Sequence, residues 1–144
     1  MNPRDLTFEE RLRDLGVFTI NLWTPEARAM PANLEKDEVL IGVVFGRYKL
    51  RHSVTSSSIG RGAVVATNRR VFLIDKKPMF MALDAIKYDE IRAVSFTKVS
   101  IAGTVRLSMD VGDISVRTFN PKCAQIFVDA VNQKLFSKKS KPIS

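Results

Sequence analysis

The stretch GAVVATNRRVFLIDKKPMFMALDAIKYDEI, residues 62–91, decides the fold. Short apolar runs alternate in it with turns that contain Asn, Arg, Lys and Pro, a pattern typical of consecutive antiparallel strands. Asn68 suits the first turn because Asn tolerates the positive φ that tight hairpins demand, and residues 76–78 form the second turn. The strands that this stretch predicts are Ala63–Thr67, Val71–Asp75 and Met79–Leu83.

Further strands are predicted on both sides of this stretch. Upstream, apolar residues alternate with a period of two from Ile41 to about Lys49, whereas residues 51–62 are rich in Ser and Gly, lack periodicity and are predicted to form a loop. The downstream strands are predicted over residues 91–99, 104–111 and 114–117. In the last two, inward apolar residues alternate with outward polar ones such as Arg106 and Arg117.

An amphipathic helix follows the last strand, with Asn120 and Pro121 at its start. Five apolar residues recur there at helical spacing and form one stripe: Ala124, Phe127, Val128, Val131 and Leu135. A short, open barrel needs a cover at one end, and a stripe of this kind suits the helix to that position.

The N-terminal residues are predicted to be mainly helical. Thr7 and Glu10 have the spacing of a capping box, which predicts a helix from Thr7 that stops at Gly16. Residues 17–23 are predicted to be extended. A second short helix is predicted to start at Thr24-Pro25 and to end at Pro31.

The segments in chain order resemble the bacterial pleckstrin-homology-like (PH-like) domains. The matching segments are NLEKDEVLIGVV (33–44), GAVVATNRRVFLI (62–74), YDEIRAVSF (88–96), VRLSMDVGDISVRTF (105–119) and AQIFVDAVNQKL (124–135). The pair Thr67 and Arg70 before an apolar strand is the most specific of these features. The resemblance implies a mainly β fold, a bent barrel of about seven antiparallel strands closed by a C-terminal helix. It implies no defined activity.

On this basis we expect three parts: a helical N-terminal extension (1–33), a PH-like domain (34–136) and a basic, flexible tail (137–144). The composition agrees with one globular domain, because 45% of the 144 residues are hydrophobic and 26% are charged. No apolar run approaches the roughly 18–20 residues that span a bilayer. The charged N-terminus lacks the apolar region of a signal peptide, and the single cysteine favours a reducing cytoplasm.

Neither a reaction nor a metal site is predicted. His52, the only histidine, lies in the Ser-rich segment without an evident catalytic arrangement, and one His with one Cys cannot form a zinc site. Cys123 falls in the first turn of the last helix, where a helix dipole lowers a thiol pKa, but a half-buried structural role is the commoner case. No cofactor is implied, because no glycine-rich loop leads into a helix.

The net charge of +8 is unevenly distributed. Residues 1–40 hold five Lys/Arg and eight Asp/Glu, whereas residues 41–74 contain no acidic residue at all. Such asymmetry indicates an anionic partner, or an acidic N-terminal segment that folds back on the basic part. The candidate anionic-ligand patch consists of Arg47, Lys49, Arg51, His52, Arg61, Arg69 and Arg70.

The prediction for function is a non-enzymatic interaction module that binds a protein partner or itself. The alternative is peripheral binding of anionic lipid headgroups at the inner membrane face. The resemblance implies that alternative, because lipid-binding PH domains hold headgroups with basic residues of the first hairpin. Nucleic acid is disfavoured, because Tyr48 is the only aromatic residue within the basic stretch.

Overall fold

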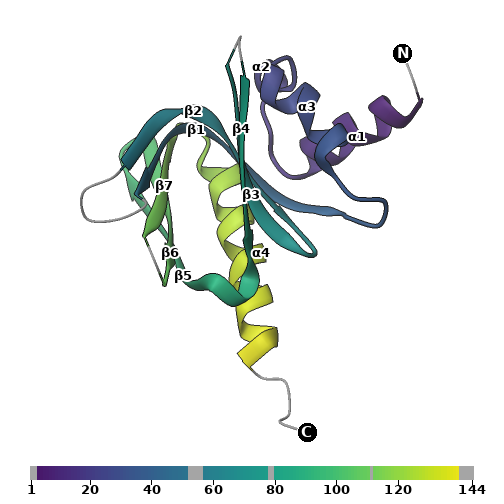
Figure 1. The fold of residues 1–144 in the computed structure, drawn as a ribbon. Coiled ribbons are helices and arrows are strands. Elements are labelled where there is room, and N and C mark those ends of the chain that lie inside the picture. The colour runs from purple at the N-terminus through teal and green to yellow at the C-terminus, as the bar shows by residue number, and fades with distance from the viewer. Residues whose placement is uncertain (1–2, 52–56, 78–79, 111, 140–144) are drawn as a thin grey trace, which may run out of the picture.

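The computed structural model describes residues 3–51, 57–77, 80–110 and 112–139. Its seven strands form one antiparallel sheet in the order β4-β3-β2-β1-β7-β6-β5, which curves around a C-terminal helix, α4 (Pro121–Lys139) (Figure 1). The strands are β1 (Leu40–Arg51), β2 (Ser57–Thr67), β3 (Arg70–Lys77), β4 (Phe80–Lys87), β5 (Ile91–Val99), β6 (Ala102–Met109) and β7 (Asp113–Thr118). Because β4 and β5 are the two edges, the barrel is open, and the predicted fold is confirmed.

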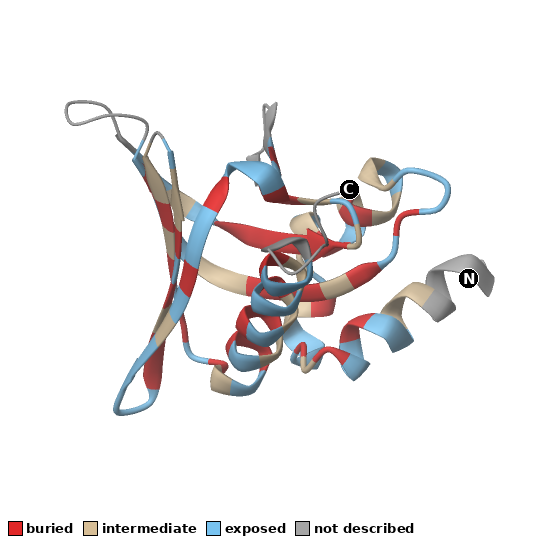
Figure 2. Ribbon diagram, turned by 90° about the horizontal axis from the view of Figure 1, so that it is seen from below, coloured by how far each residue is buried: buried red, intermediate tan, exposed pale blue. Residues whose placement is uncertain are grey.

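The inner core lies between the concave face of the sheet and α4 (Figure 2). All five residues of the predicted helical stripe are buried there, and Phe127 has 0% exposure. The start of α4 is capped as predicted, because Asn120 Oδ1 accepts a hydrogen bond from the Cys123 backbone N–H at 3.2 Å. The prediction that this helix closes the barrel core is therefore confirmed.

A second core lies on the opposite face of β1, β2 and β3. Three N-terminal helices, α1 (Pro3–Asp14), α2 (Thr19–Leu22) and α3 (Pro25–Asn33), lie together beside these strands (Figure 1). The residues that meet there include Leu12, Leu22 and Met30 from the helices and Val43, Val65, Phe72 and Ile74 from the sheet. Burial on both faces explains why β2 and β3 contain continuous apolar runs in place of a strict alternation.

Three predictions for the N-terminal part are wrong. Helix α1 begins at Pro3, a residue well suited to a first helical turn, and not at Thr7. The segment 17–23, predicted to be extended, contains the short helix α2, at whose start the Asn21 N–H donates to the Phe18 carbonyl at 2.9 Å. Helix α3 continues past Pro31 to Asn33, whose side-chain amide donates to the Ala29 carbonyl at 2.8 Å and satisfies an end of the helix.

The predicted loop over residues 51–62 is also wrong for most of its length. Residues from Ser57 onward belong to β2 and pair with β1, so that Ser57 lies opposite Arg51. The turn at Asn68 does not use a positive φ. Instead, its side-chain oxygen accepts the Val39 N–H at 2.8 Å, which ties the hairpin to the segment before β1. The fourth strand continues past Leu83 to Lys87, and residues 76 and 77 lie in β3.

Gly46 lets β1 and β7 approach each other closely. A Cβ atom there would lie 2.1 Å from the Arg117 carbonyl oxygen, and a backbone atom cannot rotate away. We therefore expect Gly46→Ala to lower the free energy of unfolding by about 1–3 kcal/mol, measured by urea denaturation. Ser95→Ala, at an exposed position of β5, is the control and should change it by less than about 0.5 kcal/mol. Equal denaturation midpoints for the two variants would contradict the close approach.

Candidate anion-binding site on the outer face

The alternation of β1 divides its side chains between the two faces of the sheet. Val44, Tyr48 and Leu50 belong to the inner core, whereas Val43 packs against the N-terminal helices. Because successive side chains of a strand point to opposite faces, the basic residues of β1 at positions 47, 49 and 51 share the outer face with Val43. The expectation that they lie on one face is therefore met by the strand geometry.

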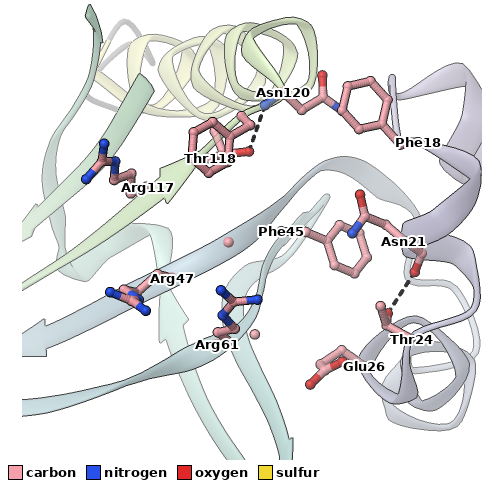
Figure 3. A pocket seen from close by; sticks show the side chains of 13 residues that line it. Phe18, Asn21, Thr24, Glu26, Phe45, Arg47, Arg61, Arg117, Thr118 and Asn120 are labelled. Carbon is pink, nitrogen blue, oxygen red and sulfur yellow. Dashed lines mark hydrogen bonds between the residues drawn. The ribbon is translucent and has the colours of Figure 1, made fainter. Parts of the chain in front are cut away.

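Arg47 lies at the centre of a row of three arginines. It pairs with Arg61 on β2 and with Arg117 on β7, and all three side chains are exposed (Figure 3). Directly opposed residues have Cβ atoms only about 5 Å apart, and like charges at that spacing repel each other. Among the described residues, neither Arg47 nor Arg61 has an ion pair. The row is therefore a concentration of positive charge that the fold itself does not neutralise.

A second row of the outer face continues the positive charge. Lys49 pairs with Ser115 of β7, which pairs in turn with Arg106 of β6. We call Arg47, Lys49, Arg61, Arg106 and Arg117 together the basic face. Around these residues the outer positions of β5 to β7 carry mostly small hydroxyl side chains, namely Ser95, Thr97, Thr104, Ser108 and Ser115.

The other predicted patch residues do not belong to the basic face. Arg51 is adjacent to it but is neutralised by Asp113, whose carboxylate accepts its guanidinium at 2.5 Å. Arg69 and Arg70 lie at the opposite end of β2, in the hairpin to β3, and pair with Glu35 and Glu38. His52 lies outside the described residues. Of the predicted patch residues that the structure describes, it brings together Arg47, Lys49, Arg51 and Arg61.

Arg70 forms a structural anchor and not a binding group. Its guanidinium donates to both carboxylate oxygens of Glu38, at 2.8 and 3.0 Å, and to the Asn33 carbonyl at 2.7 Å. The Thr67 hydroxyl also donates to Glu38, at 2.6 Å. Burial by itself raises the pKa of Glu38. The hydrogen bonds from Arg70, Thr67 and the Glu35 N–H outweigh this effect and lower the pKa from the ordinary 4.5 to about 2. The Thr-x-x-Arg feature therefore joins the N-terminal segment to the sheet.

Arg106 and Arg117 are members of the basic face that were not predicted as site residues. The period of two predicted correctly that both point outward. What the period cannot give is the pairing of β1 with β7, which places Arg117 beside Arg47 although 69 residues lie between them in the chain. A single sequence does not reveal which residues lie side by side when two strands far apart in the chain pair.

An open pocket of about 620 Å³ lies between this arginine row and the N-terminal helices. Arg47, Arg61 and Arg117 line one wall, and Asn21, Thr24 and Glu26 line the facing wall (Figure 3). The backbone of Gly46 and Gly62 contributes the surface between them. In this pocket, residues of the N-terminal helices and of the basic face line a common space.

Chemistry at Cys123 has no support in the geometry. The thiol is buried, and its Sγ donates to the Val43 carbonyl at 2.6 Å. Burial raises the pKa of this thiol to about 12, so it stays protonated at neutral pH. Within the described ranges no cluster of His, Cys, Asp and Glu could hold a metal ion. In the same ranges, no helix combines the length and apolar character required to cross a bilayer.

The sequence profile described as Bacterial PH domain matches residues 34–133, more than half of the chain. The chain belongs to the bacterial PH domain family. It is also similar in structure to the Vps36 N-terminal PH domain, with a TM-score of 0.56 and 16% identity over 75% of this chain and 86% of that chain. A second similar structure is the PH domain of USP37, with a TM-score of 0.48 and 19% identity over 64% of this chain and 97% of that one. None of the curated proteins with which it was compared matches the chain.

Membership in this family has a limited consequence for function. PH domains are in general non-catalytic modules that bind other molecules, so this bacterial PH domain has the fold of an interaction module. The likeness to the Vps36 domain, at 16% identity, shows the fold alone. The ligand therefore depends on the surface residues of this particular chain.

Proposed function

We propose that this bacterial PH domain is a non-enzymatic interaction module that binds an anionic membrane surface through the basic face. One observation carries the proposal: five cationic side chains from β1, β2, β6 and β7 are exposed on one side of the sheet, and no ion pair within the described residues neutralises them. A fold that keeps like charges in adjacent positions loses stability. An external anionic surface would neutralise these charges and relieve their repulsion.

The expected attraction is large enough to hold the protein at a membrane. Each Lys or Arg near an anionic leaflet contributes about 1 kcal/mol, so five such residues supply on the order of 5 kcal/mol at low salt. The attraction decays within a Debye length of about 8 Å at physiological ionic strength. The proposal therefore assigns the protein to the cytoplasmic face of a membrane, where the anionic lipids are.

The composition of the basic face favours a membrane over a protein partner. The centre of a protein interface is depleted in charge and enriched in aromatic residues and Met. The basic face is instead made of charged residues surrounded by small hydroxyl residues. Ile59, opposite Lys49, is a large exposed apolar neighbour. Aromatic side chains are exposed at its border instead: Phe18 is 50% exposed and Phe119 63% exposed. Exposed apolar rings beside basic side chains suit insertion at the boundary between headgroups and acyl chains.

The proposal predicts binding to anionic vesicles that depends on the basic face. The parent protein should sediment with vesicles of phosphatidylcholine and phosphatidylglycerol, and not with phosphatidylcholine alone. The triple variant Arg47→Gln/Lys49→Gln/Arg106→Gln should lose about 100-fold in vesicle partitioning, because three contributions of about 1 kcal/mol are removed. The measurement is co-sedimentation at low and at physiological salt.

A matched control separates the basic face from net charge. The variant Lys36→Gln/Lys87→Gln/Lys122→Gln has the same net charge as the triple variant of the basic face. Its three exposed lysines lie between α3 and β1, on β4 and on α4. It should retain most of the binding. Equal losses in the two triple variants, or no binding of the parent at either salt, would overturn the proposal and leave a protein partner or self-association as the function to test.

A further inference from the structure

The pocket between the N-terminal helices and the arginine row contains charges of both signs. Its sheet wall carries Arg47, Arg61 and Arg117, and its helix wall carries the carboxylate of Glu26. Figure 3 shows Glu26 below Arg61, on the helix side of the pocket. Within the described residues, neither Glu26 nor Arg61 forms an ion pair. The two charges therefore face a common space without neutralising each other.

Glu26 has a structural role that does not account for this arrangement. It lies in the first turn of α3, where the helix dipole favours a carboxylate by about 0.3–1 kcal/mol. Thr24 already caps this helix, because its hydroxyl oxygen accepts the Ala27 N–H at 3.2 Å. The dipole favours a carboxylate anywhere in the first turn, so it does not explain why this one lines a cationic pocket.

The remaining lining suits a small organic group. Phe18, Phe45 and Phe119 supply apolar surface, and the Arg117 guanidinium lies 6.0 Å from the centre of the Phe119 ring. Arginine forks match the oxygens of phosphate and carboxylate groups, and aromatic faces attract ammonium groups. A volume of about 620 Å³ lies in the range of pockets that bind small molecules. Asn21 and Thr24 add polar atoms on the helix wall.

We infer that this pocket binds a zwitterionic group, with a phosphate at the arginine row and a primary ammonium at Glu26. Phosphoethanolamine is the simplest compound with this chemistry, and it occurs both as a soluble molecule and as a lipid headgroup. The inference deepens the proposed function and rests on it, because the arginine row is part of the basic face. It adds one element that the basic face lacks, which is selection for an ammonium by Glu26.

The first test uses soluble probes and the full chain. Chemical-shift titrations with phosphoethanolamine, inorganic phosphate and ethanolamine should show tightest binding for phosphoethanolamine, by about tenfold over inorganic phosphate, because a charge-assisted hydrogen bond to Glu26 is added. Glu26→Gln should remove that preference and leave the binding of inorganic phosphate unchanged or stronger. Arg61→Gln should weaken the binding of both phosphate compounds.

The control is Glu90→Gln, which removes an exposed carboxylate remote from the pocket lining and should not alter the preference. The unperturbed spectrum of each variant reports whether it is folded. Equal affinity for phosphoethanolamine and inorganic phosphate in the parent, or a preference that survives Glu26→Gln, overturns the inference. No binding of any probe at millimolar concentration overturns it as well.

A vesicle arm distinguishes the two sources of the ligand and separates this inference from the proposed function. Vesicles of phosphatidylethanolamine and phosphatidylcholine carry no net charge, so the attraction of the basic face to an anionic surface does not act on them. Sedimentation with these vesicles, abolished by Glu26→Gln, identifies a lipid headgroup as the ligand. Binding of soluble phosphoethanolamine without such sedimentation identifies a soluble molecule. If the parent protein did not bind anionic vesicles but still bound phosphoethanolamine, the proposed function would be rejected and the ligand of the pocket would stand.

Discussion

Phe127→Asp is expected to abolish the folded state at ambient temperature. Phe127 has 0% exposure and lies on α4 against the inner face of the sheet. The backbone of Gly42 on β1 lies next to Phe127. A Cβ atom on Gly42 would be only 2.8 Å from the Phe127 Cα, so helix and strand are in close contact. The substitution removes a large buried ring and places an unpaired charge in its site. The expected cost exceeds about 5 kcal/mol, which is comparable to the whole stability of a domain.

The same helix provides the control for this variant. Phe136→Asp makes an identical chemical change about two and a half turns further on, at a side chain that is 73% exposed. Thermal unfolding followed by circular dichroism should show no cooperative transition for Phe127→Asp. For Phe136→Asp the melting temperature should stay within a few degrees of the parent. A melting temperature for Phe127→Asp near that of the parent would place α4 elsewhere.

The second large effect is expected for Arg70→Ala. The Glu38 side chain has 0% exposure, and without Arg70 its carboxylate keeps only the hydrogen bonds from Thr67 and from the Glu35 N–H. Breaking a buried ion pair on one side costs about 3–5 kcal/mol, because the remaining charge is uncompensated. The contact of the guanidinium with the Phe72 ring, 4.8 Å from its centre, is lost in addition. Urea denaturation at neutral pH measures the loss.

The pH dependence of stability provides a second signature. The pKa of Glu38 is about 2 in the folded protein and 4.5 ordinarily, so its contribution is complete above pH 4.5 and is lost as the pH falls through about 2. The difference corresponds to roughly 3 kcal/mol. In Arg70→Ala this acid-induced loss should shrink strongly, because burial then opposes the charged carboxylate with little compensation. The measurement is urea denaturation at a series of pH values from neutral to acid.

Arg69→Ala is the control for the anchor. Its partner is Glu35, and the two side chains are 45% and 61% exposed, so the pair should contribute less than about 1 kcal/mol. The double variant Arg70→Ala/Glu38→Ala should recover part of the stability that Arg70→Ala loses, since the unpaired carboxylate is gone. If Arg70→Ala were no less stable than Arg69→Ala, Glu38 would not be a buried, paired group.

Much of the fold was predictable because its signals are local. The period of two identified β1 and the inward residues of β6 and β7, and the stripe containing Phe127 identified α4. The prediction for segment 17–23 failed because alternation over only five residues, 18–22, does not exclude a helical turn. The packing of Leu22 against the sheet decides the conformation. The extension of β2 to Ser57 failed because its glycines mimic a loop, although Gly60 and Gly62 serve close packing against β3.

The candidate site was predictable only in part. Alternation along β1 predicted that Arg47 and Lys49 share a face. Charge alone also grouped Arg70 with these two residues. In the structure Arg70 lies at the far end of β2 and is already paired with Glu38. The pocket combines residues of α2, α3, β1, β2 and β7, and no pattern along the chain relates positions as distant as Glu26 and Arg117.

The double-sided packing of β1–β3 has a consequence for how this domain can be moved between proteins. The family profile begins at Leu34, yet Val43, Val65 and Phe72 face the helices that precede it. A graft of the matched segment alone would expose these side chains as a contiguous apolar surface, which promotes aggregation unless the host provides a cover. It would also lose the helix wall of the pocket. In this chain, therefore, the transplantable unit begins at the first helix and not at the family boundary.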